Sequence, residues 1–200
     1  DLEKLYEHIF SSKEELNIDV SNHGIELAQP HHQPKDHQEK QAELLFETFG
    51  VSFLHLSPQT LLSLIASGRT TGIVFDFGYE NMRCVPIYEG NMIEHAATIL
   101  DVGGRALNSY LLKILSERGW SFTGSQEVYV LIRDIKNKTG YVADDFEREL
   151  GVAATSIEKS YELPDGQVIK IGNERFRCAE PLFQPPFLGM EAAGAHETGY

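Results

Sequence analysis

The stretch from Thr70 to Gly90, TTGIVFDFGYENMRCVPIYEG, holds the polar residues of this chain that are best spaced for chemistry. Two runs of strand-forming residues flank a tight turn, and Asp76 lies at the end of the first run. A tight, glycine-containing turn of this kind is typical of a backbone that approaches a phosphate. Phe77 and Tyr79 stand where small or acidic residues would be expected, which argues against a working phosphate loop.

A second group of candidate ligands lies in the segment RDIKNK. Arg133 and Lys136 are three residues apart, so on a helix they share a face and can reach one ligand together. The alternative is a pair of solvated surface charges.

The remaining metal-ligating residue types predict no metal centre. Cys84 and Cys178 are isolated and lack the spacing of a zinc knuckle or a redox pair, so we expect two reduced, partly buried thiols. His31, His32 and His37 lie in a proline-containing loop at irregular spacing, which favours a solvated loop over a metal site.

Composition excludes several classes of function. Seventeen basic against thirty acidic side chains give a formal net charge of −13, which disfavours direct binding to nucleic acid. No apolar run approaches the roughly 20 residues that span a bilayer, and the first residues lack the order of a secretory signal. We therefore expect a cytosolic or nuclear protein without a membrane span. Because the chain opens on Asp1 inside an amphipathic segment, it looks like a piece of a longer protein.

The elements that must position these residues follow from hydrophobic periodicity. The first 66 residues predict an alternation of helix and strand: helices over 1–10, 36–49 and 58–66, and strands over IELAQ and VSFLHL. Beyond Gly68 the pattern predicts paired strands over 71–77 and 82–88, an extended piece near 92–99, and helices over 104–118 and 125–138. YVADDFEREL is ambiguous, KSYELPDGQVIKIG predicts a hairpin, and Asn173 is placed to cap a short helix.

Several longer stretches resemble the actin family: LLSLIASGRTTGIV, VPIYEG, LLKILSERGWSFT, and EKSYELPDGQVIKIGNERFRCAEPLFQPPFLGM with GAHET. The resemblance runs in register along the whole chain but covers only the middle half of a complete actin. It implies the α/β actin and sugar-kinase fold of the ribonuclease-H-like class, incomplete at both termini. In that fold, residues 1–66 belong to the first subdomain, 67–102 with 193–200 to the third, and 103–192 to the fourth.

The resemblance also implies a nucleotide site with a damaged phosphate half. In the family's second phosphate loop, Asp76 and Gly78 are kept, with Asp76 binding Mg through water. Tyr79 replaces the second carboxylate and Glu80 replaces a glycine, so both changes weaken phosphate binding. Gln59 keeps a position that orients the attacking water, whereas Arg83 replaces the family's histidine and cannot act as a base near neutral pH.

On the nucleoside side the resemblance implies that Asp101, Gly104, Arg105, Arg133 and Lys136 remain as ligands for ATP or ADP. Asn137 replaces a glutamate there, and Ala106 replaces an aspartate. The retained half-pocket is consistent with weak nucleotide binding, and the ATPase activity of the family is expected to be weak or lost.

The resemblance further implies an interaction loop. Phe187, Leu188 and Met190 form an apolar tip after two prolines, and the matching loop of actins makes contacts between filament strands. Core packing is the alternative for these residues.

We therefore expect a divergent actin-like cytoskeletal protein whose partners are actin, itself or actin-binding proteins. Two alternatives stay open. One is a functional MgATP-binding ATPase that polymerises. The other is a nuclear actin-related scaffold subunit of a chromatin-remodelling complex, although the long insertions that would favour it are not evident.

Overall fold

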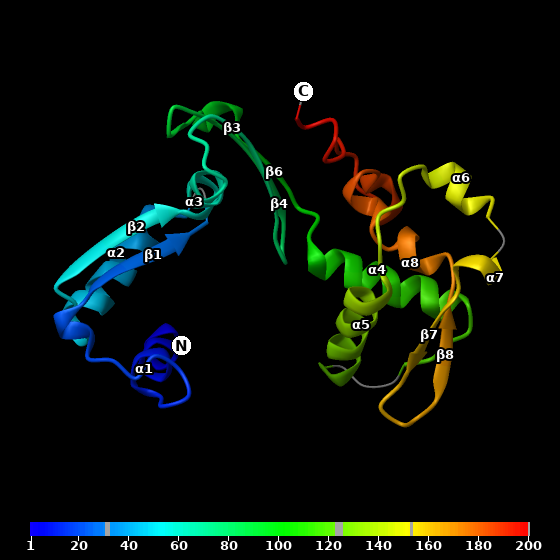
Figure 1. Ribbon diagram of the computed structural model, residues 1–200, viewed down its shortest axis with the longest axis horizontal. Coiled ribbons are helices and arrows are strands. Elements are labelled where there is room, and N and C mark those ends of the chain that lie inside the picture. Colours follow the sequence, from blue (N-terminus) through cyan, green and yellow to red (C-terminus); the bar gives the residue numbers. More distant parts are fainter. Residues whose placement is uncertain (31–32, 123–125, 153, 200) are drawn as a thin grey trace. The chain divides into compact units, whose positions relative to one another are not determined.

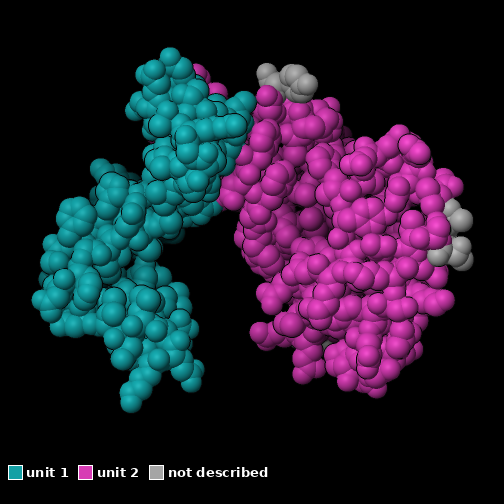
Figure 2. All heavy atoms as spheres, viewed as in Figure 1, with its two compact units in different colours: residues 1–74, 86–93 teal, residues 75–85, 94–200 magenta. Residues whose placement is uncertain are grey.

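The computed structural model of the protein describes residues 1–30, 33–122, 126–152 and 154–199, without the side chains of residues 154 and 155 (Figure 1). The expectation for His31 and His32 falls outside these described residues, while His37 lies in a helix. The chain divides into two compact units, which are residues 1–74 with 86–93 and residues 75–85 with 94–200 (Figure 2). Within the described residues, no helix has both the length and the apolar content to cross a bilayer.

The first unit is built around two parallel strands, β1 and β2. Its elements are α1 (Leu2–Ser11), the 3₁₀ turn η1 (Val20–Asn22), β1 (Gly24–Gln29), α2 (Lys35–Glu43), the π-helical turn η2 (Leu44–Thr48), β2 (Phe53–Pro58) and α3 (Gln59–Ala66). The strands pair from Gly24 opposite Phe53 to Gln29 opposite Pro58. Parallel pairing requires a crossover, which α2 and η2 supply. The alternation of helix and strand that the sequence predicts is confirmed.

The core of the first unit is mainly aromatic. Tyr6 and Phe10 stack at 5.7 Å between ring centroids, and Phe49 packs edge-on against Phe10 at 5.4 Å. The single helix predicted over 36–49 is wrong in its second half, where a π-turn begins at Leu44. Leu45 in that turn is completely buried, and its carbonyl accepts a hydrogen bond from the Val51 amide. The wider turn is thus stabilised by tertiary contacts that local periodicity does not record.

The antiparallel strands β3 (Gly72–Phe77) and β4 (Met82–Tyr88) form a hairpin that contributes to both units. The single extended piece predicted near 92–99 is wrong, because it divides into β5 (Asn91–Met92) and β6 (Thr98–Leu100) around the 3₁₀ turn η3 (Glu94–Ala96). β5 pairs with the end of β4, at Ile87, and β6 pairs with its beginning, at Met82. Because β5 and β6 pair with opposite ends of β4, the chain turns between them at η3.

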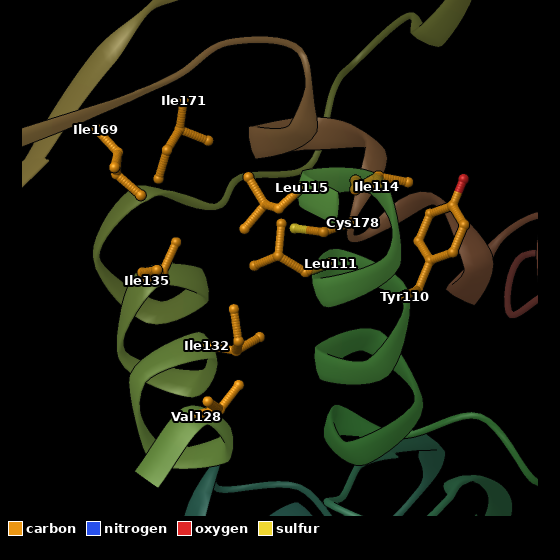
Figure 3. Close-up of a cluster of buried hydrophobic side chains, with 10 residues drawn as sticks. All are labelled: Tyr110, Leu111, Ile114, Leu115, Val128, Ile132, Ile135, Ile169, Ile171 and Cys178. Carbon is orange, nitrogen blue, oxygen red and sulfur yellow. The ribbon is translucent and has the colours of Figure 1, made fainter. Parts of the chain in front are cut away.

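Helices α4 (Gly104–Glu117) and α5 (Gln126–Thr139) supply most of the core of the second unit. The later elements are α6 (Phe146–Leu150), α7 (Ala154–Ile157), the hairpin β7 (Lys159–Glu162) and β8 (Val168–Ile171), α8 (Glu174–Arg177), and the 3₁₀ turns η4 (Glu180–Leu182) and η5 (Pro185–Leu188). Figure 3 shows apolar side chains of α4 and α5 facing one another, with Ile169 and Ile171 of β8 and the thiol of Cys178 beside them. The predicted inward faces of α4 and α5 are confirmed. Both cysteines are free and buried, as expected.

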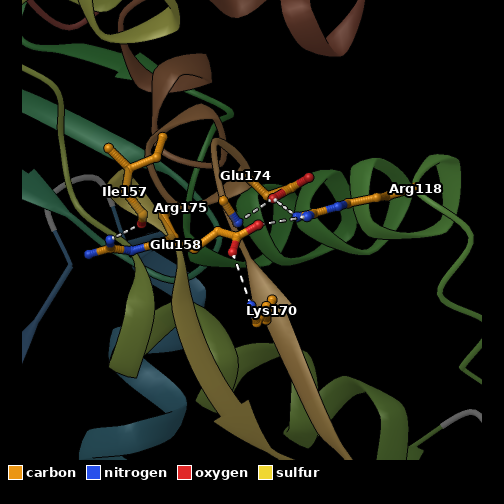
Figure 4. Close-up of polar contacts among 7 residues, drawn as sticks. Arg118, Ile157, Glu158, Lys170, Glu174 and Arg175 are labelled. Atoms are coloured by element: carbon orange, nitrogen blue, oxygen red, sulfur yellow. Dashed lines mark hydrogen bonds and ion pairs between the residues drawn. The ribbon is translucent and has the colours of Figure 1, made fainter. Parts of the chain in front are cut away.

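A buried carboxylate holds the start of α8. Glu174 is 4% exposed, and its Oε2 accepts hydrogen bonds from the Gly172 amide at 2.8 Å and from Arg118 Nη1 at 3.0 Å (Figure 4). The predicted cap by the Asn173 side chain is wrong, because this residue occupies the cap position with helical backbone angles and its side chain makes no capping bond. The adjacent Glu158 pairs with Arg118 at 3.5 Å and with Lys170 at 3.6 Å.

Candidate functional site

The turn between β3 and β4 is closed by its own backbone. The Gly78 amide donates to the Asn81 carbonyl at 3.0 Å. A Cβ atom at position 78 would lie 2.9 Å from the same carbonyl oxygen, so the turn favours glycine there. Tyr79 and Glu80 occupy the tip and are exposed.

The same turn packs against the N-terminus of α4. The Gly104 amide donates to the Gly78 carbonyl at 3.0 Å, and the Arg105 amide donates to the Tyr79 carbonyl at 2.8 Å. At position 103 a Cβ atom would lie 2.6 Å from the Tyr79 carbonyl oxygen, so only glycine fits without a shift of the backbone. The first amides of a helix are the groups that usually bind an anion, and here two of them bind backbone carbonyls.

Two side-chain contacts hold the tip of the turn. The Tyr79 hydroxyl donates to the Tyr129 hydroxyl of α5 at 2.8 Å, with the rings edge to face at 6.5 Å. This hydrogen bond raises the pKa of Tyr79 above its usual value. Arg105 Nη1 lies 3.2 Å from Glu80 Oε2, and the pairing raises the pKa of the guanidinium. The basic side chain expected to contact a ligand is therefore paired within the protein.

Asp76 and Arg83 face each other across the hairpin. Arg83 Nη1 lies 3.8 Å from Asp76 Oδ2, and the side chains are only 16% and 28% exposed. Arg83 Nε is buried and makes no hydrogen bond to any described residue. The carboxylate predicted to hold Mg through water thus has a cation beside it.

A cavity of about 270 Å³ lies behind the start of α4, between α5 and the segment after α8. Its lining includes Leu107, Lys136, Asn137, Gly140, Tyr141, Val142, Cys178 and Ala179. The Lys136 ammonium group donates to the Gly104 carbonyl at 3.1 Å, and burial lowers the pKa of Lys136. Asp101 and Arg133 are exposed and are not among these lining residues. Of the predicted nucleoside ligands, Lys136 lines the cavity, and its hydrogen bond joins it to Gly104.

Gln59 belongs to the first unit. It is the first residue of α3, after Pro58, and is half-buried. Its backbone carbonyl accepts a hydrogen bond from the Ser63 hydroxyl at 2.9 Å.

The apolar residues predicted to form an interaction loop lie at and after η5. Gly189 ends this turn in the left-handed conformation, with φ of 74°. Phe187 is 38% exposed and contacts Tyr110 and Phe146 at centroid distances of 6.2 and 5.7 Å. Leu188 and Met190 are half-buried and pack against the cores of the second unit.

Comparison with known proteins places this chain. Residues 1–198 match the family model described as Actin. The chain belongs to the actin family. A Dictyostelium discoideum protein named "Putative actin-29" is 40% identical over 204 aligned residues, which cover 100% of this chain and 52% of that relative. The present chain therefore spans about half the length of the curated actin relative that it matches, and its mixed helices and strands agree with the actin fold.

Sequence reasoning missed three residues of the candidate site. Tyr129 was not singled out, because nothing in its local pattern signals contact with a turn 50 residues earlier. Gly103 was also missed, although the pair Gly103-Gly104 before a helical pattern is a detectable signal of close backbone approach. Tyr141 lines the cavity beside Lys136, and only tertiary structure brings it there.

Proposed function

We propose that this chain is a divergent actin-family protein that contributes filament or complex assembly contacts and whose ATP site is weak or degenerate. The observation that carries the proposal is the use of the Gly104 and Arg105 amides by the carbonyls of Gly78 and Tyr79. A phosphate group that approached α4 would have to replace these two hydrogen bonds. It would also meet the negative charge of Glu80.

The nucleoside half of the proposed site fits its ligand better. The cavity beside Lys136 is lined mostly by apolar atoms, and its lining residues include Lys136, Asn137 and Tyr141. Those groups suit a flat heterocyclic base that needs stacking and a few hydrogen bonds. Lys136, Gly104 and Arg105 would hold the nucleoside of ATP or ADP, with Asp101 and Arg133 as outer contacts.

Hydrolysis is expected to be slow. A bound Mg²⁺ would supply charge stabilisation for a transferring phosphoryl group. Asp76 and Gly78 are the residues that would position Mg²⁺ water and phosphate, and Gln59 is the family position for the attacking water. Arg83 stays charged and already lies beside Asp76, so it offers no base and competes with a metal for the carboxylate.

Assembly contacts are proposed for Phe187, with Leu188 and Met190 supporting it from the core. Phe187 is the exposed member, after two prolines and before a left-handed glycine. Partners would be a second copy, actin or an actin-binding protein, within the cytoskeleton.

We assign residues 1–66 to the first actin subdomain, 67–102 with 193–200 to the third and 103–192 to the fourth.

Calorimetric titration of the folded chain with MgATP, followed by phosphate release on the same sample, tests the nucleotide proposal. We expect no saturable heat at micromolar ATP and no release of phosphate above background. Saturable binding at micromolar ATP would instead favour the alternative of a functional actin ATPase.

A single substitution tests whether the negative charge of Glu80 is what weakens ATP binding. Glu80→Gly removes one negative charge near the phosphate position and frees Arg105, so ATP affinity should rise, by a factor that corresponds to about 1 kcal/mol. Glu191→Gly, at an exposed position outside the site, is the matched control and should leave ATP affinity unchanged. Equal affinities in wild type and Glu80→Gly would show that the charge is not what weakens the site.

The assembly proposal has its own test. Phe187→Ala should reduce co-sedimentation with filaments of actin or of this chain, while circular dichroism confirms that the chain stays folded. Phe53→Ala, at another exposed phenylalanine, controls for a general loss of apolar surface. Unchanged co-sedimentation of Phe187→Ala would remove this residue from the interface.

A further inference from the structure

A larger cavity, of about 600 Å³, lies in the second unit between the loop before α6, the turn η4 and the segment around residue 196. Three carboxylates line it, those of Asp144, Glu180 and Glu197, and none of its lining residues is a lysine or an arginine. The nucleotide proposal does not use these three residues.

Glu180 is the residue that makes this cavity unusual. It is 6% exposed, and its Oε1 accepts a hydrogen bond from Gln184 Nε2 at 2.8 Å. Within the described ranges no lysine, arginine or histidine forms an ion pair with it. A carboxylate that is withdrawn from water usually has a cationic partner, because the transfer of an unpaired charge is costly. Among the described residues the other buried carboxylate is Glu174, and it has such a partner in Arg118.

The cavity also has aromatic lining residues. Phe146 and Phe183 line the same cavity, and the ring of Phe183 lies 6.0 Å from the ring of His196. Aromatic faces attract cations through their quadrupole, most strongly where water is excluded. Among the residues that the structure describes, no three His, Cys, Asp or Glu side chains converge closely enough to hold a metal ion. The combination suits an organic cation with an apolar stem.

We propose that this cavity binds an ammonium or guanidinium group carried on an alkyl chain, with Glu180 as its charged partner, Asp144 and Glu197 as outer carboxylates, and Phe146 and Phe183 against the stem. Such a group occurs on free diamines and on the lysine or arginine side chains of a partner protein. Both sources share the chemistry that the cavity recognises.

The test is a titration of the whole chain, followed through backbone amide shifts in nuclear magnetic resonance. The probes are agmatine, N-acetylargininamide and the uncharged isostere N-acetylcitrullinamide. We expect saturable shifts at Val142, Ala143 and Phe183 with the two guanidinium compounds and none with the citrulline compound. Tighter binding of agmatine would identify a free amine as the source, and tighter binding of N-acetylargininamide would identify a protein side chain.

Variants connect the binding to the carboxylates. Glu180→Gln keeps the size of the side chain and can still accept from Gln184, yet it should weaken agmatine binding by about tenfold or more, as loss of a charge-assisted bond does. Asp144→Asn, at an exposed position that does not threaten folding, should weaken binding by a smaller factor. Glu117→Gln, exposed on α4 and outside the cavity, is the matched control and should bind like wild type.

Three results would overturn the proposal. They are the absence of saturable shifts from the folded chain at agmatine concentrations up to about 10 mM, equal binding of the citrulline compound, and wild-type affinity in both Glu180→Gln and Asp144→Asn.

Discussion

The hydroxyl of Tyr79 donates a hydrogen bond to the hydroxyl of Tyr129 across 2.8 Å, and this contact joins the β3–β4 turn to helix α5. Together with the pair Glu80 and Arg105, it holds the turn from two sides. Tyr79 and Glu80, which differ from the residues expected in a phosphate loop, therefore form contacts of their own within the protein.

The first prediction concerns the ionisation of Tyr79. Its pKa is raised chiefly because its hydroxyl proton is held by Tyr129, so Tyr129→Phe should lower the pKa of Tyr79 toward its usual value of 10.0. Tyrosine labelled at Cζ allows each phenol to be titrated separately by nuclear magnetic resonance. Tyr88→Phe, which removes an exposed hydroxyl elsewhere, should leave the Tyr79 titration unchanged. An identical Tyr79 titration in wild type and Tyr129→Phe would contradict the assigned hydrogen bond.

The second prediction compares two adjacent glycines at the start of α4. Gly103→Ala places a methyl group 2.6 Å from backbone atoms of the turn, so it should destabilise the chain by about 1–3 kcal/mol, as overpacking does. Gly104→Ala meets nothing closer than 3.4 Å, the Lys136 ammonium group at the end of a flexible side chain. Its effect on urea unfolding should be small or stabilising, because alanine favours a helix over glycine. Equal loss in the two variants would refute the close approach of the turn to α4.

The third prediction concerns the carboxylate under α8. Arg118→Ala leaves Glu174 buried with the Gly172 amide as its remaining donor among the described residues, so the free energy of unfolding should fall by about 1–3 kcal/mol. Lys170→Ala breaks an ion pair whose lysine is 68% exposed, and its cost should not exceed about 1 kcal/mol. Chemical denaturation of both variants supplies the comparison, and a larger loss from Lys170→Ala would contradict the ranking.

The fourth prediction is a dependence of stability on alkaline pH. Burial raises the pKa of Cys178 from its usual 9.0 to about 11, so between these values the folded chain holds a proton that the unfolded chain releases. The contribution to stability is complete below about pH 9 and is lost as pH rises through about 11, with a total of roughly 2–3 kcal/mol.

Cys178→Ala removes this contribution. Urea midpoints measured from neutral pH to about pH 11 should therefore fall less steeply in the variant than in wild type. Because the tyrosines that titrate at high pH are common to both proteins, the difference between the two curves isolates the thiol. Parallel curves would show that Cys178 is not the group responsible.

The sequence predicted the elements that have a strong local pattern. The apolar faces of α4 and α5 and the hairpin around Pro164 each carry a periodic signal or a turn composition that acts over a few residues. In the ambiguous stretch YVADDFEREL only the second half forms a helix, α6, which the Asp145 side chain caps by accepting a hydrogen bond from the Arg148 amide at 3.0 Å. An aspartate before a helical segment is a capping signal, but the many charged residues around Asp145 obscured it in the sequence.

The sequence-based predictions that were wrong concern elements that depend on contacts between distant segments. The π-turn at Leu44 forms around a fully buried side chain, and the split between β5 and β6 follows from the two registers on β4. In the candidate site, the resemblance to actins supplied the residues Asp76, Gly78 and Lys136. It did not supply the pairing of Tyr79 with Tyr129, because it describes Tyr79 only as the replacement of a family carboxylate and assigns no role to Tyr129.

The parallel pairing of β1 with β2 has a consequence for how the chain folds. Gly24 meets Phe53 only after the whole connection through α2 and η2 has closed, so the hydrogen bonds between β1 and β2 cannot form early. The β7–β8 hairpin of the second unit closes across a short turn instead. Along this chain β2 is made well after β1, so the pairing between the two strands has to wait until β2 has been made.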